Sequence, residues 1–93
     1  MEQCTTREQT AKLIELGFEK PFFLRRTYLI GELIEILEEV ASVVISYSYQ
    51  KNGYYVRVII PKRGGGGMYR ISQSELIDAL YYMIIKLKEE GVI

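Results

Sequence analysis

The chain has 93 residues, the size of one domain, and its hydrophobic fraction of 48% excludes an intrinsically disordered protein. Twelve basic and twelve acidic residues cancel, so no overall field directs the protein to nucleic acid or to an anionic membrane. The single cysteine, Cys4, cannot form an internal disulfide and favours a reducing compartment. The sequence shows no N-terminal apolar segment and no apolar run of about 20 residues, so we expect a cytoplasmic protein without a membrane span.

The first predicted helix begins at Thr5 or Thr6, because each threonine has a glutamate or glutamine three residues further on, as in a capping box. Gly17 is expected to end this helix in the left-handed conformation. Segment 19–27 contains Pro21, which excludes a helix interior, so we expect a loop or a short strand that packs its phenylalanines on the core. The apolar stripe of this first predicted helix consists of Ala11, Ile14 and Phe18, with Leu13 and Leu16 beside them.

A second helix is predicted from about Ile30 to Glu39, with one apolar face and glutamates on the rest. Four glutamates could suggest a cation site. Sites for hard cations, however, use closely spaced oxygen ligands, usually with aspartate, asparagine and a turn glycine, so we interpret the glutamates as a solvated face. The apolar residues are Ile30, Leu33, Ile34, Leu37 and Ala41, and the glutamates are Glu32, Glu35, Glu38 and Glu39.

Residues 42–61 form two β-branched and aromatic runs joined at Asn52-Gly53, which predicts a hairpin. A two-residue turn would pair Tyr49 with Val56, whereas a four-residue turn would pair Tyr49 with Tyr54. Both registers keep one apolar set together for the core: Val43, Ile45, Tyr47, Tyr49, Tyr54, Val56, Val58 and Ile60. We expect the opposite face to be open to solvent or to a partner; it carries Val44, Ser46, Ser48, Tyr55, Arg57 and Ile59.

The segment after the hairpin begins with Pro61, which is expected to stop the second strand because proline has no amide hydrogen to donate. The glycine run 64–67 lacks the Lys-Ser/Thr ending of a phosphate-binding P-loop, so we interpret it as a mobile loop between strands. Residues 68–71 could add a short third strand beside the second and extend the hairpin to a meander.

The last helix is predicted to begin at a capping box of Ser72 with Glu75, or at Ser74, and to close at Gly91. Val92 is placed for the apolar contact that accompanies a C-terminal glycine. An unbroken apolar stripe is formed by Leu76, Ile77, Leu80, Met83, Ile84 and Leu87. The apolar surface is widened by Tyr81, Tyr82 and Ile85, which indicates either a deeply packed helix or one that also contacts another subunit.

These elements predict a single α+β domain over residues 1–93 in the order α-α-β-β-(β)-α, a small antiparallel hairpin or meander packed against three helices. The chain has no histidine, the commonest general base and transition-metal ligand, and Cys4 therefore has no histidine to activate it. The cysteine and aspartate do not follow a metal-binding spacing. We expect no enzyme activity, no cofactor and no metal site.

The charges are unevenly distributed, because the stretch from Lys51 to Arg70 has five basic residues and no acidic one. Arginines beside exposed aromatics on a sheet can bind single-stranded nucleic acid through phosphate contacts and base stacking. The alternative is structural, since Lys and Arg protect sheet edges and tyrosine favours strands. The candidate partner-binding residues are Tyr55, Arg57, Lys62, Arg63 and Arg70 around the hairpin, and Tyr81, Tyr82 and Ile85 on the last helix.

Three segments resemble a family of short bacterial proteins that often occur in prophage-like or mobile regions. The resemblance lies in residues 6–18 (TREQTAKLIELGF), 30–37 (IGELIEIL) and 75–81 (ELIDALY). It implies this architecture and no established activity. The leading hypothesis, a non-enzymatic protein-interaction module of the prophage accessory type that self-associates, rests on the wide apolar surface of the last helix and the half-polar outer face of the hairpin. The alternative is a single-stranded nucleic-acid-binding protein that uses the basic and tyrosine residues of the hairpin. No small-molecule substrate is indicated.

Overall fold

The computed structural model describes residues 4–18, 28–60 and 67–93. The predicted α+β class and element order are confirmed, and the third strand that the sequence left open is present in a three-stranded antiparallel sheet of order β1-β2-β3. Expectations for segment 19–27, Pro61, Lys62, Arg63 and glycines 64–66 lie outside the described residues. The elements are α1 (Arg7–Glu15), α2 (Ile30–Glu38), β1 (Ser42–Ser48), β2 (Gly53–Ile60), β3 (Gly67–Gln73) and α3 (Leu76–Glu89).

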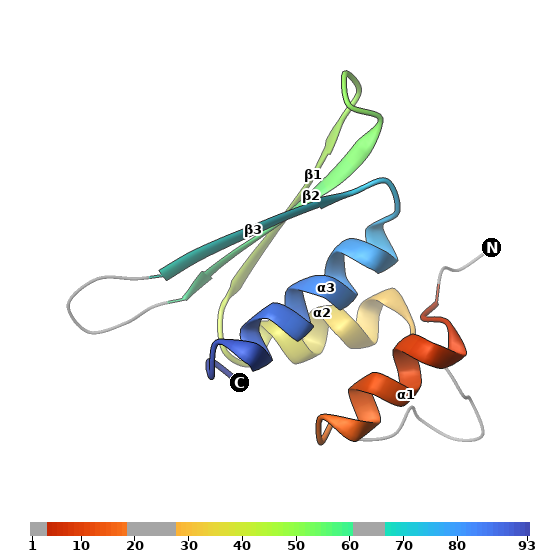
Figure 1. Ribbon diagram of the computed structural model, residues 1–93. Coiled ribbons are helices and arrows are strands. Elements are labelled where there is room, and N and C mark those ends of the chain that lie inside the picture. The colour runs from red at the N-terminus through yellow and green to blue at the C-terminus, as the bar shows by residue number, and fades with distance from the viewer. Residues whose placement is uncertain (1–3, 19–27, 61–66) are drawn as a thin grey trace.

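Two helices cover one face of the sheet, as Figure 1 shows. Helix α2 packs against β1 and α3, and α3 packs against β2 and β3. Helix α1 lies further from the sheet, so the expected packing of the sheet against three helices is wrong for α1. The buried core of the described residues consists of Leu13, Tyr28, Leu33, Leu37, Val56, Val58, Ile60, Ile77, Ala79, Leu80, Tyr81, Met83, Ile84 and Leu87.

Thr6, one of the two predicted capping residues, is the N-cap of helix α1, and the capping box is confirmed. The Gln9 amide donates to the Thr6 hydroxyl over 3.1 Å, and the Thr6 amide donates to the Gln9 side-chain oxygen over 2.9 Å. The Gln9 side-chain nitrogen also donates to the carboxylate of Asp78 in the first turn of α3 over 2.9 Å. Gln9 therefore both completes the capping box of α1 and attaches this helix to α3.

A buried threonine pair, Thr5 and Thr10, attaches α1 to the start of α2. The Tyr28 amide donates to the Thr5 hydroxyl over 2.8 Å, and the Thr5 and Thr10 hydroxyl oxygens are 2.6 Å apart. Because the Thr10 hydroxyl donates to the Thr6 carbonyl over 2.9 Å, Thr5 is the donor to Thr10. The sequence pattern did not indicate this contact: it placed Ala11 on the apolar stripe, yet Ala11 is exposed and Thr10 is buried.

The two predicted C-terminal glycines are confirmed. Gly17 and Gly91 have φ angles of 100° and 76°, the left-handed region that favours glycine. At each helix end the residue after the glycine donates its amide to a carbonyl five residues back, Phe18 to Leu13 and Val92 to Leu87, which is the Schellman arrangement. Val92 also packs against the core, as its position predicted.

The hairpin is present, but both expected registers are wrong. Ser48 pairs with Gly53 and Tyr47 pairs with Tyr54, so the loop consists of residues 49–52. The loop has four residues, as in the second alternative, but begins one residue earlier. Within the strands the expected sets still point toward the helices, because the register differs from both alternatives by an even number of residues. Tyr49, which was expected in the core, lies in the loop instead and is 89% exposed.

Asn52 and Gly53 have different roles from those of a two-residue turn. Asn52 takes the left-handed conformation, with a φ of 49°, while Gly53 belongs to β2. A Cβ atom on Gly53 would lie 2.9 Å from the carbonyl oxygen of Gln73 on β3. The glycine therefore allows β3 to approach closely, and this constraint arises from a residue 20 positions away that turn chemistry does not reveal.

Helix α3 begins later than predicted. Ser72 belongs to β3, where it pairs with Tyr55, and the helix starts at Leu76 with Glu75 at the N-cap. Neither Ser72 nor Ser74 therefore caps it, and both expected capping residues are wrong. The physical reason is that the ladder with β2 takes the backbone through Gln73, which leaves only two residues to connect β3 with the helix.

Candidate functional site

The structure gathers three of the predicted residues on the sheet face that no described helix covers. Arg57 of β2 pairs directly with Arg70 of β3, and Tyr55 lies two residues from Arg57 on the same face. Like charges directly opposite each other destabilise a sheet. No aspartate or glutamate occurs between Glu39 and Glu75 to balance them. This face, which we call the open face, is therefore a site of unbalanced positive charge.

Tyr55 holds two cations over its ring. The Arg70 guanidinium carbon lies 4.7 Å and the Lys51 ammonium nitrogen 5.7 Å from the ring centroid, both within cation–π range. A side-chain hydrogen bond with Lys51 lowers the pKa of Tyr55; partial burial opposes this shift, and the charges of Lys51 and Arg70 add to it. Lys51 reaches the ring because the hairpin loop starts at residue 49. It was part of the basic stretch but not of the predicted set.

The open face also carries exposed apolar side chains. Val44 of β1 pairs with Arg57 and is 39% exposed, whereas Ile59, near the end of β2, is 40% exposed and lies beside the exposed Met68 of β3. The face can thus contact a partner that combines an apolar group with a negative charge. Lys62 and Arg63, which were expected to contribute, lie outside the described residues.

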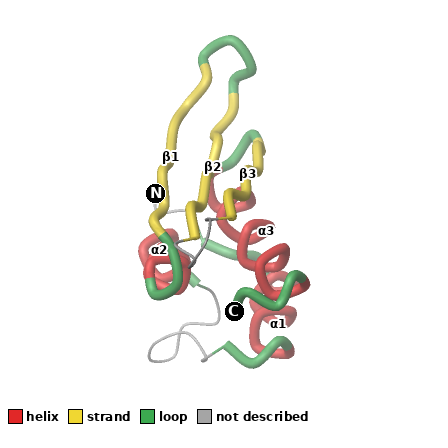
Figure 2. The backbone as a smooth tube through the Cα atoms, turned by 90° about the vertical axis from the view of Figure 1, so that its left-hand side faces the viewer, coloured by secondary structure: helices red, strands yellow, loops and turns green. Residues whose placement is uncertain are grey.

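The hairpin extends beyond the helices, as Figure 2 shows. On the helix side of the sheet, Val56 and Val58 of β2 are fully buried, but on β1 Ile45 is 37% and Tyr47 40% exposed. Only Val43, at the end of β1 near α2, is half-buried among the expected core residues of that strand. The expectation that this face of β1 belongs to the core therefore holds for one end of the strand only.

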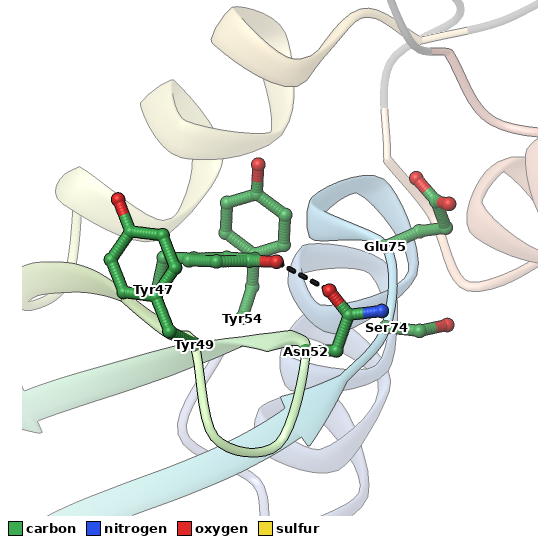
Figure 3. A pocket seen from close by; sticks show the side chains of 6 residues that line it. All are labelled: Tyr47, Tyr49, Asn52, Tyr54, Ser74 and Glu75. Atoms are coloured by element: carbon green, nitrogen blue, oxygen red, sulfur yellow. Dashed lines mark hydrogen bonds between the residues drawn. The ribbon is translucent and has the colours of Figure 1, made fainter.

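Three tyrosines gather at the hairpin tip and line an open cleft of about 550 Å³ (Figure 3). The ring centroid of Tyr47 lies 5.0 Å from that of Tyr49 and 4.9 Å from that of Tyr54, both in edge-to-face geometry. The Tyr47 hydroxyl donates to the side-chain oxygen of Asn52 over 2.6 Å, which fixes the ring. Ser74 and Glu75, from the turn before α3, form the opposite side.

The three candidate residues on α3 are separate from the open face. Tyr81 belongs to the core, Ile85 is half-buried, and Tyr82 is 46% exposed. Burial raises the pKa of Tyr81, and the neighbouring Tyr82, 5.2 Å away between ring centroids, adds to that shift. Of the two interpretations left open for α3, the structure supports the deeply packed helix. A partner contact through Tyr82 stays a prediction.

The described residues contain no group of three or more Cys, Asp or Glu side chains close enough to hold a metal ion. Cys4 is exposed with a free thiol, and its backbone forms an isolated bridge with Leu29. No helix in the described ranges is long and apolar enough to span a bilayer.

Comparisons with known proteins do not assign the chain to a family. No family model matches the chain, and neither the curated proteins nor the solved structures gave a match. The resemblance to prophage-associated bacterial proteins therefore stays a prediction.

Proposed function

We propose that this protein is a non-enzymatic interaction module that self-associates through its sheet. One observation supports this most directly: of the seven large apolar side chains exposed in the described part of the chain, six belong to the sheet or its hairpin loop. These are Val44, Ile45, Tyr47, Tyr49, Ile59 and Met68, and the seventh is Tyr82 on α3.

Concentrated exposure of this kind favours association. Large apolar side chains scattered singly are normal on a protein surface, whereas neighbouring ones that form a patch mark a contact. Removal of apolar surface from water is favourable by roughly 25 cal/mol per Å². The proposal places the protein in the cytoplasm, where the exposed thiol of Cys4 stays reduced, as a prophage-type accessory protein in line with the resemblance.

Sedimentation velocity from micromolar to near-millimolar concentration tests this proposal. We expect the sedimentation coefficient to rise with concentration toward that of a dimer. Hydrogen exchange at the two ends of this range should show slower exchange in β1 and the hairpin loop at high concentration, and no change in the interior of α3. A strict monomer over the whole range would overturn self-association.

A second candidate function is the binding of single-stranded nucleic acid on the open face, and the cluster of Tyr55, Arg57 and Arg70 supports it. Two arginines on neighbouring strands can contact successive phosphates, and a base can stack on Tyr55 when phosphate draws Arg70 away from the ring. The net charge of zero does not prevent this, because the acidic residues lie outside the sheet.

Titration of a fluorescent oligothymidylate at several salt concentrations tests the second candidate. Binding should weaken with salt, and Arg57→Gln or Arg70→Gln should each reduce the slope of log K against log salt by about 0.7, the value for one phosphate contact on a single strand. Lys88→Gln on α3 is the control with an equal loss of charge. Absence of binding at low salt, or an equal effect of Lys88→Gln, would contradict specific binding on the open face.

A further inference from the structure

The outer edge of β1 has no backbone partner among the described residues. β1 is hydrogen-bonded to β2 alone in the sheet, and within residues 4–18, 28–60 and 67–93 no other backbone hydrogen bond involves residues 42–48. An unpaired edge offers a row of amide and carbonyl groups to another strand, and natural proteins usually protect such edges with charges, proline, bulges or a covering segment. β1 contains no charged residue and no proline.

The two outer strands of the sheet differ at their centres. β1 and β3 both have seven residues, and the central residue is Ile45 in β1 and Arg70 in β3. If two copies paired centrally through β3, Arg70 would face Arg70, and directly opposed like charges are destabilising. If they paired through β1, Ile45 would face Ile45. The sequence therefore protects one edge of the sheet and leaves the other available to the same strand of a second copy.

We propose that a second copy of this chain pairs with β1 in antiparallel orientation about a two-fold axis at Ile45. The two sheets then form one six-stranded sheet. This inference rests on the proposed self-association and specifies its contact. It places Val43 opposite Tyr47, Val44 opposite Ser46, and Ser42 opposite Ser48. Aromatic side chains opposite β-branched ones are among the favourable cross-strand pairs, and no charge opposes a charge.

The side chains of β1 fit this pairing. Ile45 and Tyr47 lie on the helix side of the sheet but are more than a third exposed. In the dimer their neighbours on that side are Ile45 and Val43 of the second copy. Each copy therefore packs against apolar side chains of β1 that are exposed in the single chain. Because the axis is perpendicular to the sheet, the contact is the same on both copies and the assembly closes as a dimer.

The dimer also determines where the helices of the two copies lie. A two-fold axis perpendicular to the sheet places the helices of both copies on the same side, and α2 is the helix next to β1. Its exposed glutamates, Glu35 and Glu38, lie opposite the buried Leu33 and Leu37 on the helical wheel and therefore point away from the core. The open faces join to one surface with two copies of the Tyr55, Arg57 and Arg70 cluster.

Disulfide trapping tests the register directly. In the Cys4→Ser background, Ile45→Cys places two thiols opposite each other, where the Cα atoms of antiparallel partners are about 4.5–5.5 Å apart, within disulfide range. We expect mild oxidation to give a covalent dimer. The control is Ser48→Cys in the same background, because its two copies would be offset by six residues, roughly 20 Å. Equal trapping of both variants, or none of Ile45→Cys, would overturn the proposed register.

Charge substitution tests the same contact without a cross-link. Ile45→Lys should raise the dimer Kd by about tenfold or more, because symmetry brings the two lysines together. Ile59→Lys is the matched control, since Ile59 is 40% exposed against 37% for Ile45 but lies on the central strand and the open face. Circular dichroism and thermal unfolding test whether each variant folds. If Ile45→Lys does not fold, disulfide trapping of Ile45→Cys decides whether β1 is the contact.

The outcomes separate this inference from the function on which it rests. If the protein dimerises and Ile59→Lys disrupts the dimer while Ile45→Lys does not, self-association holds but occurs through the open face, and the edge-pairing inference is wrong. If the wild-type chain is a monomer at every concentration, both fail. If Ile45→Lys alone weakens the dimer and Ile45→Cys is trapped, the β1 edge is the contact.

Discussion

Helix α3 and strand β1 are both rich in apolar residues, yet they are buried to very different extents. Seven of the 14 residues of α3 are buried, whereas none of the seven residues of β1 is. The difference arises from what lies next to each element. α3 is enclosed by the sheet, by α2 and by the contact of Asp78 with α1, while α2 covers only one end of β1. Apolar composition therefore does not indicate which surface is available to a partner.

The largest expected effect comes from the enclosed side of α3. Leu80 is fully buried, so Leu80→Ala should destabilise the protein by about 2–5 kcal/mol through lost burial and a residual cavity. Tyr82→Ala, two residues further on the same helix, should change the free energy of unfolding by no more than about 0.5 kcal/mol. Urea denaturation of both variants measures the difference. If both variants lost the same free energy of unfolding, Leu80 and Tyr82 would not lie on a buried and an exposed side of α3.

Much of the fold could be predicted from the sequence, because its signals are local. The capping box at Thr6, the terminal Gly17 and Gly91, and the alternation of β2 each depend on residues close together in the chain. The hairpin register could not be predicted, since the close approach of Gln73 to Gly53 is a tertiary contact.

Only part of the candidate site could be predicted, because only some of its features depend on residues close together in the chain. Alternation along β2 was enough to place Tyr55 and Arg57 on one face. The pairing of Arg57 with Arg70, and the position of Lys51 over the Tyr55 ring, depend on the observed strand registers and loop. The exposure of Ile45 was missed because alternation assigns a face and does not indicate where the covering helix ends.

Helix α1 provides a further comparison with α3, because buried hydrogen bonds of Thr5 attach α1 to the start of α2. Thr5→Val should destabilise the protein by about 1–3 kcal/mol, because it leaves the buried Tyr28 amide without its acceptor and Thr10 without its donor. Thermal and urea unfolding measure the loss. The specific readout is faster hydrogen exchange of the Tyr28 amide. Thr6→Ala, which removes the exposed cap, should cost about 1 kcal/mol and leave Tyr28 protected.

The close contact at Gly53 tests the approach of β3 to the start of β2. Gly53→Ala should destabilise the protein by about 1–3 kcal/mol, since the new methyl group meets the rigid carbonyl of Gln73. Gly31→Ala in α2 has open space around the added group and should stabilise by about 0.4–1 kcal/mol. Equilibrium unfolding of the two variants should therefore give changes of opposite sign. A neutral Gly53→Ala would contradict the observed approach of β3.

The smallest effects concern ionisation of one tyrosine from each region. Tyr55 on the sheet has a lowered pKa and Tyr81 in α3 a raised one, so alkaline titration of tyrosinate absorbance should lose an early step in Tyr55→Phe and a late step in Tyr81→Phe. The pKa of an unperturbed tyrosine is about 10. Tyr55 should therefore add stability only at alkaline pH, above that value, and this contribution is lost as pH falls through the lower folded pKa.

Tyr81 gives the opposite dependence. Its folded pKa exceeds the unfolded value, so its contribution to stability is complete below about pH 10 and is lost as pH rises through the folded pKa. Urea unfolding across this range should show a smaller alkaline loss of stability in Tyr81→Phe than in the wild type, because phenylalanine cannot ionise in the core. Tyr49→Phe is the control, with an 89% exposed ring in the hairpin loop. If Tyr49→Phe protected as well as Tyr81→Phe, the enclosed side of α3 would not be the source of the effect.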